Sequence, residues 1–120
     1  MSKCIYLVED DDDIRFIVEY VLIEEGYEVK AFGTASEFHK GLSTNKIDLI
    51  ILDVMLPDGN GIDICRKLKT NNQTSHIPVV IMSAHAAEKS ILEEACADGF
   101  INKPFDLKDL TNQIKTHLKT

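Results

Sequence analysis

The sequence between residues 47 and 61 reads Ile47-Asp48-Leu49-Ile50-Ile51-Leu52-Asp53-Val54-Met55-Leu56-Pro57-Asp58-Gly59-Asn60-Gly61. A short run rich in Ile and Leu, bounded by Pro and Gly, is typical of a strand buried on both faces of a parallel sheet. Asp53 therefore ends the predicted strand, at the edge where open parallel α/β sheets bind ligands. Taken alone, such an aspartate more often caps a turn, so its role depends on what else shares that edge.

The composition and charge limit the classes of protein to which the chain can belong. The chain has 120 residues, 44% of them hydrophobic, and 20 acidic against 13 basic residues give a net charge of −7. We expect one domain, 1–120, with Met1 as a true N-terminus and without direct nucleic-acid binding, which needs a basic face. Apolar stretches are too short for a membrane span or a signal peptide, and three widely spaced cysteines favour a reducing compartment. These features predict a cytoplasmic protein.

Strand-like and helix-like segments alternate five times along the chain. Short apolar runs predict strands, and apolar residues at helical spacing between them predict helices, the first of which stops at Gly26. The pattern predicts a flavodoxin-like (βα)5 domain, a parallel five-stranded sheet of order 2-1-3-4-5 with helices on both faces. The predicted strands are 5–8, 27–32, 49–52, 79–83 and 100–101, and the predicted helices are 14–25, 35–42, 61–70, 91–96 and 107–118.

Local signals predict how the helices begin and which faces they bury. Residues 34–37, Thr-Ala-Ser-Glu, form a capping box, and Asp106 is placed to cap the last helix. We expect the helix at 61–70 to bury Ile62, Cys65 and Leu68, and the last helix to bury Leu107, Leu110, Ile114 and Leu118.

Polar residues follow four of the predicted strands at the same edge. Glu9 and Asp10 follow the first strand, Asp53 ends the third, Ser83 ends the fourth and Lys103 follows the fifth. Two carboxylates about 4 Å apart repel by roughly 4 kcal/mol at an effective dielectric of 20, so the cluster needs compensating cations. An all-oxygen, partly open site suits Mg²⁺, and Lys103 is a second, fixed cation. A hydroxyl and an ammonium beside a carboxylate suit phosphoryl oxygens, which predicts phosphoryl transfer to a carboxylate.

Four pieces of sequence together resemble one family. They are Leu7-Val8-Glu9-Asp10, then Leu52 to Gly61, then Ile81-Met82-Ser83-Ala84, then Ala97-Asp98-Gly99-Phe100-Ile101-Asn102-Lys103-Pro104-Phe105. In this order the chain resembles the response-regulator receiver domain, the phospho-accepting module of two-component signalling, from Cys4 to the last helix. The resemblance implies that Asp53 accepts the phosphoryl group. It also implies that Asp10 binds Mg²⁺ directly, Glu9 binds it through water, and the backbone carbonyl of Met55 is a further ligand.

The same resemblance implies a switch. Ser83 would be the switch hydroxyl, Phe100 the switch aromatic and Lys103 the phosphate-binding cation, with the Lys103-Pro104 bond usually cis. A histidine kinase or a histidine phosphotransfer protein would be the phosphodonor. An output domain or a target protein would bind the face formed by the fourth helix, the fifth strand and the last helix. Within this region the interval from Ser83 to Lys103 is shorter than in most receivers, and Cys96 stands where the family often has Gly.

Two other functions use similar parts. A Mg²⁺-dependent phosphatase or phosphotransferase could use Asp53 on a small metabolite, but such enzymes usually carry a second Asp where this chain has Met55. A flavin or nucleotide module is disfavoured because no Gly-rich phosphate loop follows the first strand, and the five acids there, Glu9 to Asp13, would repel phosphate. We expect a signalling switch rather than an enzyme.

Overall fold

The computed structural model of the chain describes residues 2–42, 46–84 and 97–118. The helix predicted at 91–96, with Cys96, lies outside these residues. Among the described residues, no helix is long and apolar enough to cross a bilayer. The elements in chain order are β1 (Cys4–Val8), α1 (Asp12–Glu24), β2 (Glu28–Phe32), α2 (Ala35–Gly41), β3 (Leu49–Asp53), β4 (Met55–Leu56), β5 (Gly59–Asn60), α3 (Gly61–Thr70), β6 (Val79–Ser83), β7 (Gly99–Asn102) and α5 (Leu107–His117).

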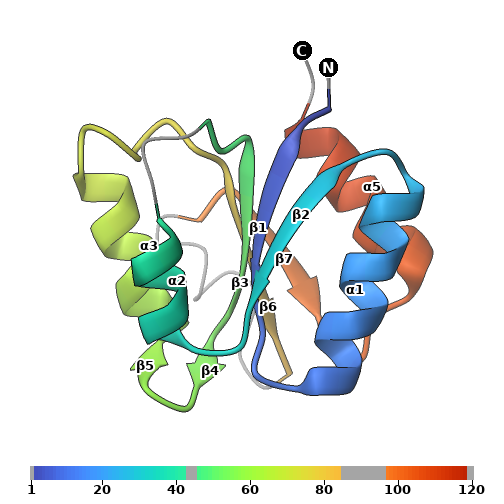
Figure 1. Cartoon of the computed structure of the whole chain (residues 1–120), viewed down its shortest axis with the longest axis horizontal. Coiled ribbons are helices and arrows are strands. Elements are labelled where there is room, and N and C mark those ends of the chain that lie inside the picture. Colours follow the sequence, from blue (N-terminus) through green and yellow to red (C-terminus); the bar gives the residue numbers. More distant parts are fainter. Residues whose placement is uncertain (1, 43–45, 85–96, 119–120) are drawn as a thin grey trace.

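The main sheet has five strands in the order β2-β1-β3-β6-β7, and its neighbouring strands pair in parallel. This confirms the predicted order of the strands. In Figure 1, α1 and α5 cover one face of this sheet, and α2 and α3 cover the other. All carboxyl ends of the parallel strands therefore meet at one edge, which is the lower edge in Figure 1.

Each face of the sheet has its own hydrophobic core. One core joins Val18 and Leu22 of α1 and Leu110 and Ile114 of α5 to alternate strand residues such as Ile51. The other core joins α2 and α3 to the remaining strand residues. Because β3 lies in the middle of the sheet, its five residues are all buried, which explains the unbroken apolar run that ends at Asp53.

Three of the predicted helix boundaries are confirmed. The backbone N–H of Glu37 donates to the Thr34 hydroxyl, and that of Lys108 donates to the Asp106 carboxylate. Gly26 has φ of +97°, the left-handed conformation expected just after a helix. Two of these signals thus mark where α2 and α5 begin, and the third marks where α1 ends.

Three predicted core positions and one loop differ from expectation. Leu118, just after α5, is only partly buried against its core. Leu107 is 44% exposed, because the first residue of α5 lies ahead of the turn that packs on the sheet. In α3, Ile64 is buried beside Cys65 and Leu68, whereas Ile62 is only partly buried against the same core. The segment after Asp53 also forms a small antiparallel hairpin, β4 with β5, that the sequence pattern did not predict.

Candidate functional site

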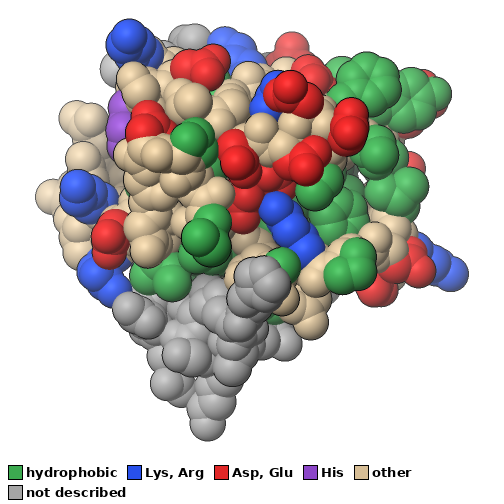
Figure 2. Space-filling view, turned by 90° about the horizontal axis from the view of Figure 1, so that it is seen from below, with side chains coloured by type: hydrophobic (Ala, Val, Ile, Leu, Met, Phe, Trp, Pro, Cys, Tyr) green, Lys and Arg blue, Asp and Glu red, His purple; other side chains and the backbone are tan. Residues whose placement is uncertain are grey.

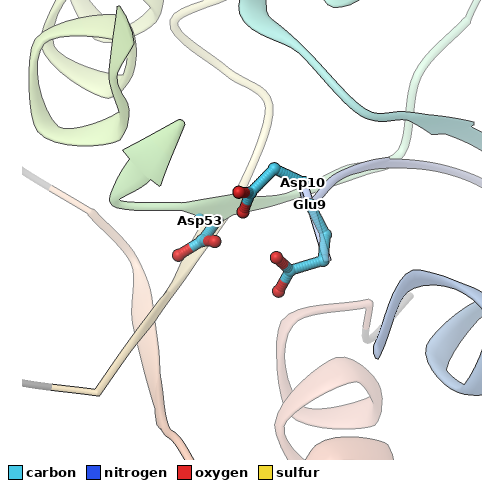
Figure 3. Close-up of side chains that lie close together, drawn as sticks. All are labelled: Glu9, Asp10 and Asp53. Carbon is cyan, nitrogen blue, oxygen red and sulfur yellow. The ribbon is translucent and has the colours of Figure 1, made fainter. Parts of the chain in front are cut away.

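Three carboxylates meet at the carboxyl edge of the sheet. Asp53 is the last residue of β3, and Glu9 and Asp10 follow β1, the neighbouring strand. One carboxylate oxygen from each residue lies within 4.8 Å of the other two. Figure 3 shows the three side chains converging from these two strand ends. Seen from this edge, acidic side chains gather around a basic one near the centre of the surface (Figure 2).

The backbone on both sides of Glu9 is held by hydrogen bonds. Its N–H donates to the carbonyl of Phe32 at the end of β2 (3.0 Å), and its carbonyl accepts from Nη1 of Arg15 (2.8 Å). Its side chain is fully buried and accepts a hydrogen bond from the backbone N–H of Asp11 through Oε2 (3.1 Å). Asp10, by contrast, is exposed to solvent. The loop therefore fixes one carboxylate inside the protein and leaves the next one open.

Lys103 reaches the same cluster from the end of β7, the strand at one edge of the sheet. Its Nζ lies 2.6 Å from Oε1 of Glu9 and 3.1 Å from Oδ2 of Asp53. The backbone N–H of Lys103 donates to the carbonyl of Ser83 (2.9 Å), and the peptide bond to Pro104 is cis, as the resemblance implies. The sequence prediction that one ammonium would compensate the carboxylates is thus matched by two ion pairs.

Burial and charge shift two pKa values in this cluster. Burial raises the pKa of Glu9 to about 7, and the neighbouring Asp53 carboxylate raises it too, although Lys103 acts in the opposite direction. Burial by itself lowers the pKa of Lys103, but its contacts with Glu9 and Asp53 outweigh that effect and raise the pKa above the ordinary value. Lys103 is therefore charged at neutral pH, while Glu9 is poised between its two forms.

The site fits a divalent cation. Among the described residues, Oε1 of Glu9 is a buried side-chain oxygen with no aligned hydrogen-bond donor, although Lys103 lies close by. Buried carboxylate oxygens are costly unless they are paired or bind a metal ion. The three side chains offer only oxygen ligands, and Asp10 leaves one side open to water. This donor set matches the preference of Mg²⁺ for hard oxygen ligands in a partly hydrated site.

The segment after Asp53 is packed tightly against it. A Cβ built on Gly61 would lie 2.1 Å from the carbonyl oxygen of Asp53, so only glycine fits there. The Asp58 carboxylate accepts from the backbone N–H groups of Ala35 (2.7 Å) and Ser36 (2.9 Å), which hold its pKa below the ordinary value. These contacts fix the short hairpin that carries Met55, whose side chain is exposed and which follows Asp53 by two residues.

Ser83 and Phe100 lie on one face of the sheet. Ser83 is the last residue of β6 and is 6% exposed, and Phe100 in β7 is 7% exposed. Ser83 pairs with Asn102, and Ile81 pairs with Phe100, in the parallel register. Phe100 and Ile81 share the core on the α3 side of the sheet. The aromatic ring therefore lies two residues behind Ser83 on the same face, buried in the core.

Sequence reasoning missed several residues that shape the site. Arg15, Asp58 and Gly61 hold the two loops but carry none of the predicted chemistry. Arg15 lies three residues after Asp12, about one helical turn, and this spacing could have indicated a contact with the run of acids. Asp58 follows a proline in a turn, where an aspartate usually bonds locally, so nothing in the sequence pointed to its contact with α2.

Comparisons with known proteins agree with this geometry. Residues 5–115 match the family described as the response regulator receiver domain. The chain is 33% identical over 120 residues to the transcriptional regulatory protein GltR of Pseudomonas aeruginosa, covering 98% of this chain and 50% of that protein. It is 34% identical over 121 residues to the alkaline phosphatase synthesis transcriptional regulatory protein PhoP of Bacillus subtilis, covering 99% and 50%. The chain thus spans about half the length of these curated relatives.

A solved structure shows the same fold. The crystal structure of a putative response regulator from Chloroflexus aurantiacus superimposes with a TM-score of 0.90 at 28% identity, covering 98% of both chains. The family match, the two relatives and the arrangement of the strands all point the same way. The chain belongs to the response regulator receiver domain family of two-component signalling.

Proposed function

We propose that this chain is a phosphorylation-dependent switch that accepts a phosphoryl group on Asp53 from a phosphohistidine partner. The observation that supports this most directly is the contact of Lys103 with both Asp53 and Glu9, inside a cluster of three carboxylates. A buried carboxylate with a positioned cation on one side and an open metal site on the other is arranged to accept a phosphoryl group. In this proposal the described residues form one receiver domain, and the reaction that the domain catalyses is its own phosphorylation and dephosphorylation.

The residues have distinct tasks in the transfer. An Asp53 carboxylate oxygen attacks phosphorus, the new oxygen–phosphorus bond forms as the nitrogen–phosphorus bond of phosphohistidine breaks, and the imidazole leaves. Asp10, Asp53 and the Met55 carbonyl would hold Mg²⁺, with Glu9 in support through water. When bound, Mg²⁺ neutralises negative charge on the reacting oxygens. Lys103, already 3.1 Å from Asp53, donates to a phosphoryl oxygen and keeps its charge throughout.

The signal would then pass from Ser83 to Phe100. A phosphoryl group on Asp53 attracts the Ser83 hydroxyl and the Lys103 ammonium, because both donate to its oxygens. Since Ser83 and Phe100 share one face, a shift of Ser83 changes the space available to the ring, which is already buried in this structure. The change would reach β7 and α5, the described part of the predicted output face. The rest of that face falls within residues 85–96, outside the described residues.

The outer face of α1 supports a protein as the phosphodonor. Phe16 is 69% exposed, Tyr20 58% and Ile23 52%, and their spacing places them on one side of the helix. Figure 2 shows hydrophobic side chains gathered on the side of the molecule where α1 lies. An exposed apolar stripe of this kind marks an interaction surface, and α1 begins beside the acceptor site.

Acidic residues border this stripe, with Asp12 and Glu19 on one side and Asp13 and Glu24 on the other. A second copy of the chain would bring like charges together there, whereas a helix with an apolar stripe and a Lys or Arg border would fit. We assign this surface to the phosphohistidine-bearing donor, which must in any case come close to Asp53.

The first prediction concerns the acceptor. Asp53→Asn abolishes labelling by acetyl phosphate with Mg²⁺, because the amide cannot attack phosphorus. The control Asp63→Asn, at an exposed position of α3, is labelled like the wild type. Intact-protein mass spectrometry measures the added phosphoryl group. Full labelling of Asp53→Asn would disprove the assignment.

The second prediction concerns the metal site and pH. Glu9 supports the metal ion through water only as a carboxylate, and since its pKa is about 7, affinity for Mg²⁺ rises by up to about tenfold between pH 6 and 8 as Glu9 loses its proton. In the metal-free protein the folding stability changes with pH in the opposite direction to the metal affinity. The raised pKa means that folded Glu9 contributes stability at low pH, which is lost as the pH rises through 7. Calorimetric Mg²⁺ titration and thermal unfolding measure both trends, and Glu9→Gln should flatten them; persistence of both in that variant would contradict the assignment.

The third prediction separates transfer from switching. Ser83→Ala still accepts a phosphoryl group on Asp53 but loses much of the response at β7 and α5, because the hydroxyl that links the phosphoryl group to Phe100 is gone. Amide chemical shifts of β7 and α5, recorded with and without beryllofluoride as a phosphoryl mimic, report this response. Shifts as large in Ser83→Ala as in the wild type would show that the signal takes another path.

The fourth prediction tests the donor surface. Tyr20→Ala lowers kcat/KM for transfer from an autophosphorylated histidine kinase that labels the wild type by about tenfold, a typical cost for truncating an aromatic anchor. Acetyl phosphate needs no docking surface, so its labelling rate stays unchanged. Leu107→Ala on α5, where Leu107 is also exposed, is the matched control. Equal losses with both donors would place Tyr20 in the chemistry or the fold, and unchanged transfer from the kinase would exclude it from docking.

A further inference from the structure

The exposed carboxylate of Asp58 fastens two segments that are distant in the sequence. Its Oδ1 accepts a hydrogen bond from the backbone N–H of Ala35 (2.7 Å), and its Oδ2 accepts one from that of Ser36 (2.9 Å). These are the first two residues of α2, whereas Asp58 lies in the turn between β4 and β5. In Figure 1 this hairpin lies below α2, at the carboxyl edge of the main sheet. Asp58 therefore joins the segment after the acceptor to the start of a helix.

The first turn of α2 has two caps of different origin. Thr34 is the local cap, because its hydroxyl accepts from the backbone N–H of Glu37 (3.0 Å). Asp58 is the remote cap, and it accepts from two N–H groups that have no partner within the helix. The Ser36 and Ala35 N–H groups hold the pKa of Asp58 below its ordinary value, so this carboxylate is ionised at neutral pH. One cap thus serves the helix alone, and the other also holds the hairpin.

The hairpin is too short to hold its own shape. β4 and β5 have two residues each, and even longer isolated hairpins are only marginally stable in water. One end of the hairpin is fixed beside the acceptor, where the N–H of Gly61 donates to the carbonyl of Val54 (2.7 Å). Asp58 fixes the other end, and Met55 lies between the two fixed points. Without Asp58, ordering the Met55 backbone around a metal ion would cost more conformational entropy.

We propose that Asp58 is a positioning residue for the metal site, which holds the hairpin in place for Mg²⁺ binding by the Met55 carbonyl and couples that binding to α2. The inference rests on the proposed function, in which this carbonyl is a ligand. Coupling between two sites is reciprocal, so metal binding must in turn strengthen the contacts of Asp58 with α2. In this way α2, which contributes no residue to the carboxylate cluster, responds to the metal ion.

The first test is a calorimetric titration of the whole chain with MgCl₂ at pH 8. Asp58→Ala should bind Mg²⁺ about tenfold more weakly than the wild type, at the low end of the range for residues that orient metal ligands. Asp58→Asn loses the charge but keeps one acceptor oxygen, so its affinity should fall only about threefold. Unchanged affinity in Asp58→Ala would overturn the proposal. Equal losses in the two variants would do so as well, because they would assign the effect to charge alone.

Thr34→Ala is the matched control, because it removes the other cap of the same helix. Loss of either cap should lower the unfolding temperature by about 4 °C. Only the loss of Asp58 should weaken Mg²⁺ binding, so Thr34→Ala should keep the affinity of the wild type within about twofold. A tenfold loss in Thr34→Ala would show that fraying of α2, rather than the hold of Asp58 on the hairpin, controls the metal site.

Amide hydrogen exchange, read by peptide mass spectrometry, measures the hold on the hairpin without any metal ion. Asp58→Ala should exchange several-fold faster than the wild type over residues 55–60, whereas Thr34→Ala should not. In the wild type, saturating MgCl₂ should slow exchange at Ala35 and Ser36, and Asp58→Ala should lose this effect. Exchange at these two amides that ignores MgCl₂ in the wild type would contradict the coupling to α2.

Failure of the proposed function would look different. If the wild type binds no Mg²⁺ at all, the metal site itself is wrong, and no variant of Asp58 is needed to show it. If the wild type binds Mg²⁺ and Asp58→Ala binds it equally well, the metal site stands and the positioning role of Asp58 falls.

Discussion

The mutual repulsion of three carboxylates at one edge of the sheet is the constraint on which the rest of the site depends. A parallel sheet places Glu9, Asp10 and Asp53 together because all its strands end at that edge. Three carboxylates against one ammonium leave two negative charges when all are ionised. A divalent cation would cancel that excess, so the fold itself creates a demand that a bound metal ion would meet.

Much of the fold could be predicted because its signals are local or periodic. The buried run before Asp53, the caps at Thr34 and Asp106, and the stop at Gly26 each need only a few neighbouring residues. The candidate site followed from topology, because knowing that the strands are parallel is enough to bring their polar ends together. The family resemblance then assigned roles to these residues.

What could not be predicted depends on packing between distant segments. Leu107 fits the apolar pattern of α5 but lies ahead of its first buried turn, so periodicity alone misplaced it. The pairing of Glu9 with Lys103 joins the ends of β1 and β7, which have two strands between them, and Asp58 bonds to residues of α2 that precede it by more than twenty positions. Such contacts are set by tertiary geometry and leave no periodic trace in the sequence.

Under the proposed function, the same cluster would link a small chemical event to a change at the face that includes β7 and α5. A shift from about 1:99 to 99:1 between two states needs roughly 5.5 kcal/mol of differential stabilisation. Lys103 and Ser83 lie next to each other, joined by a backbone hydrogen bond of 2.9 Å, so one phosphoryl group can engage both side chains. Charge-assisted hydrogen bonds contribute about 1.5–3 kcal/mol each, so a few of them suffice. Phe100 shares the core with Ile81, two residues before Ser83, and in the proposed switch this packing would carry the shift into β7.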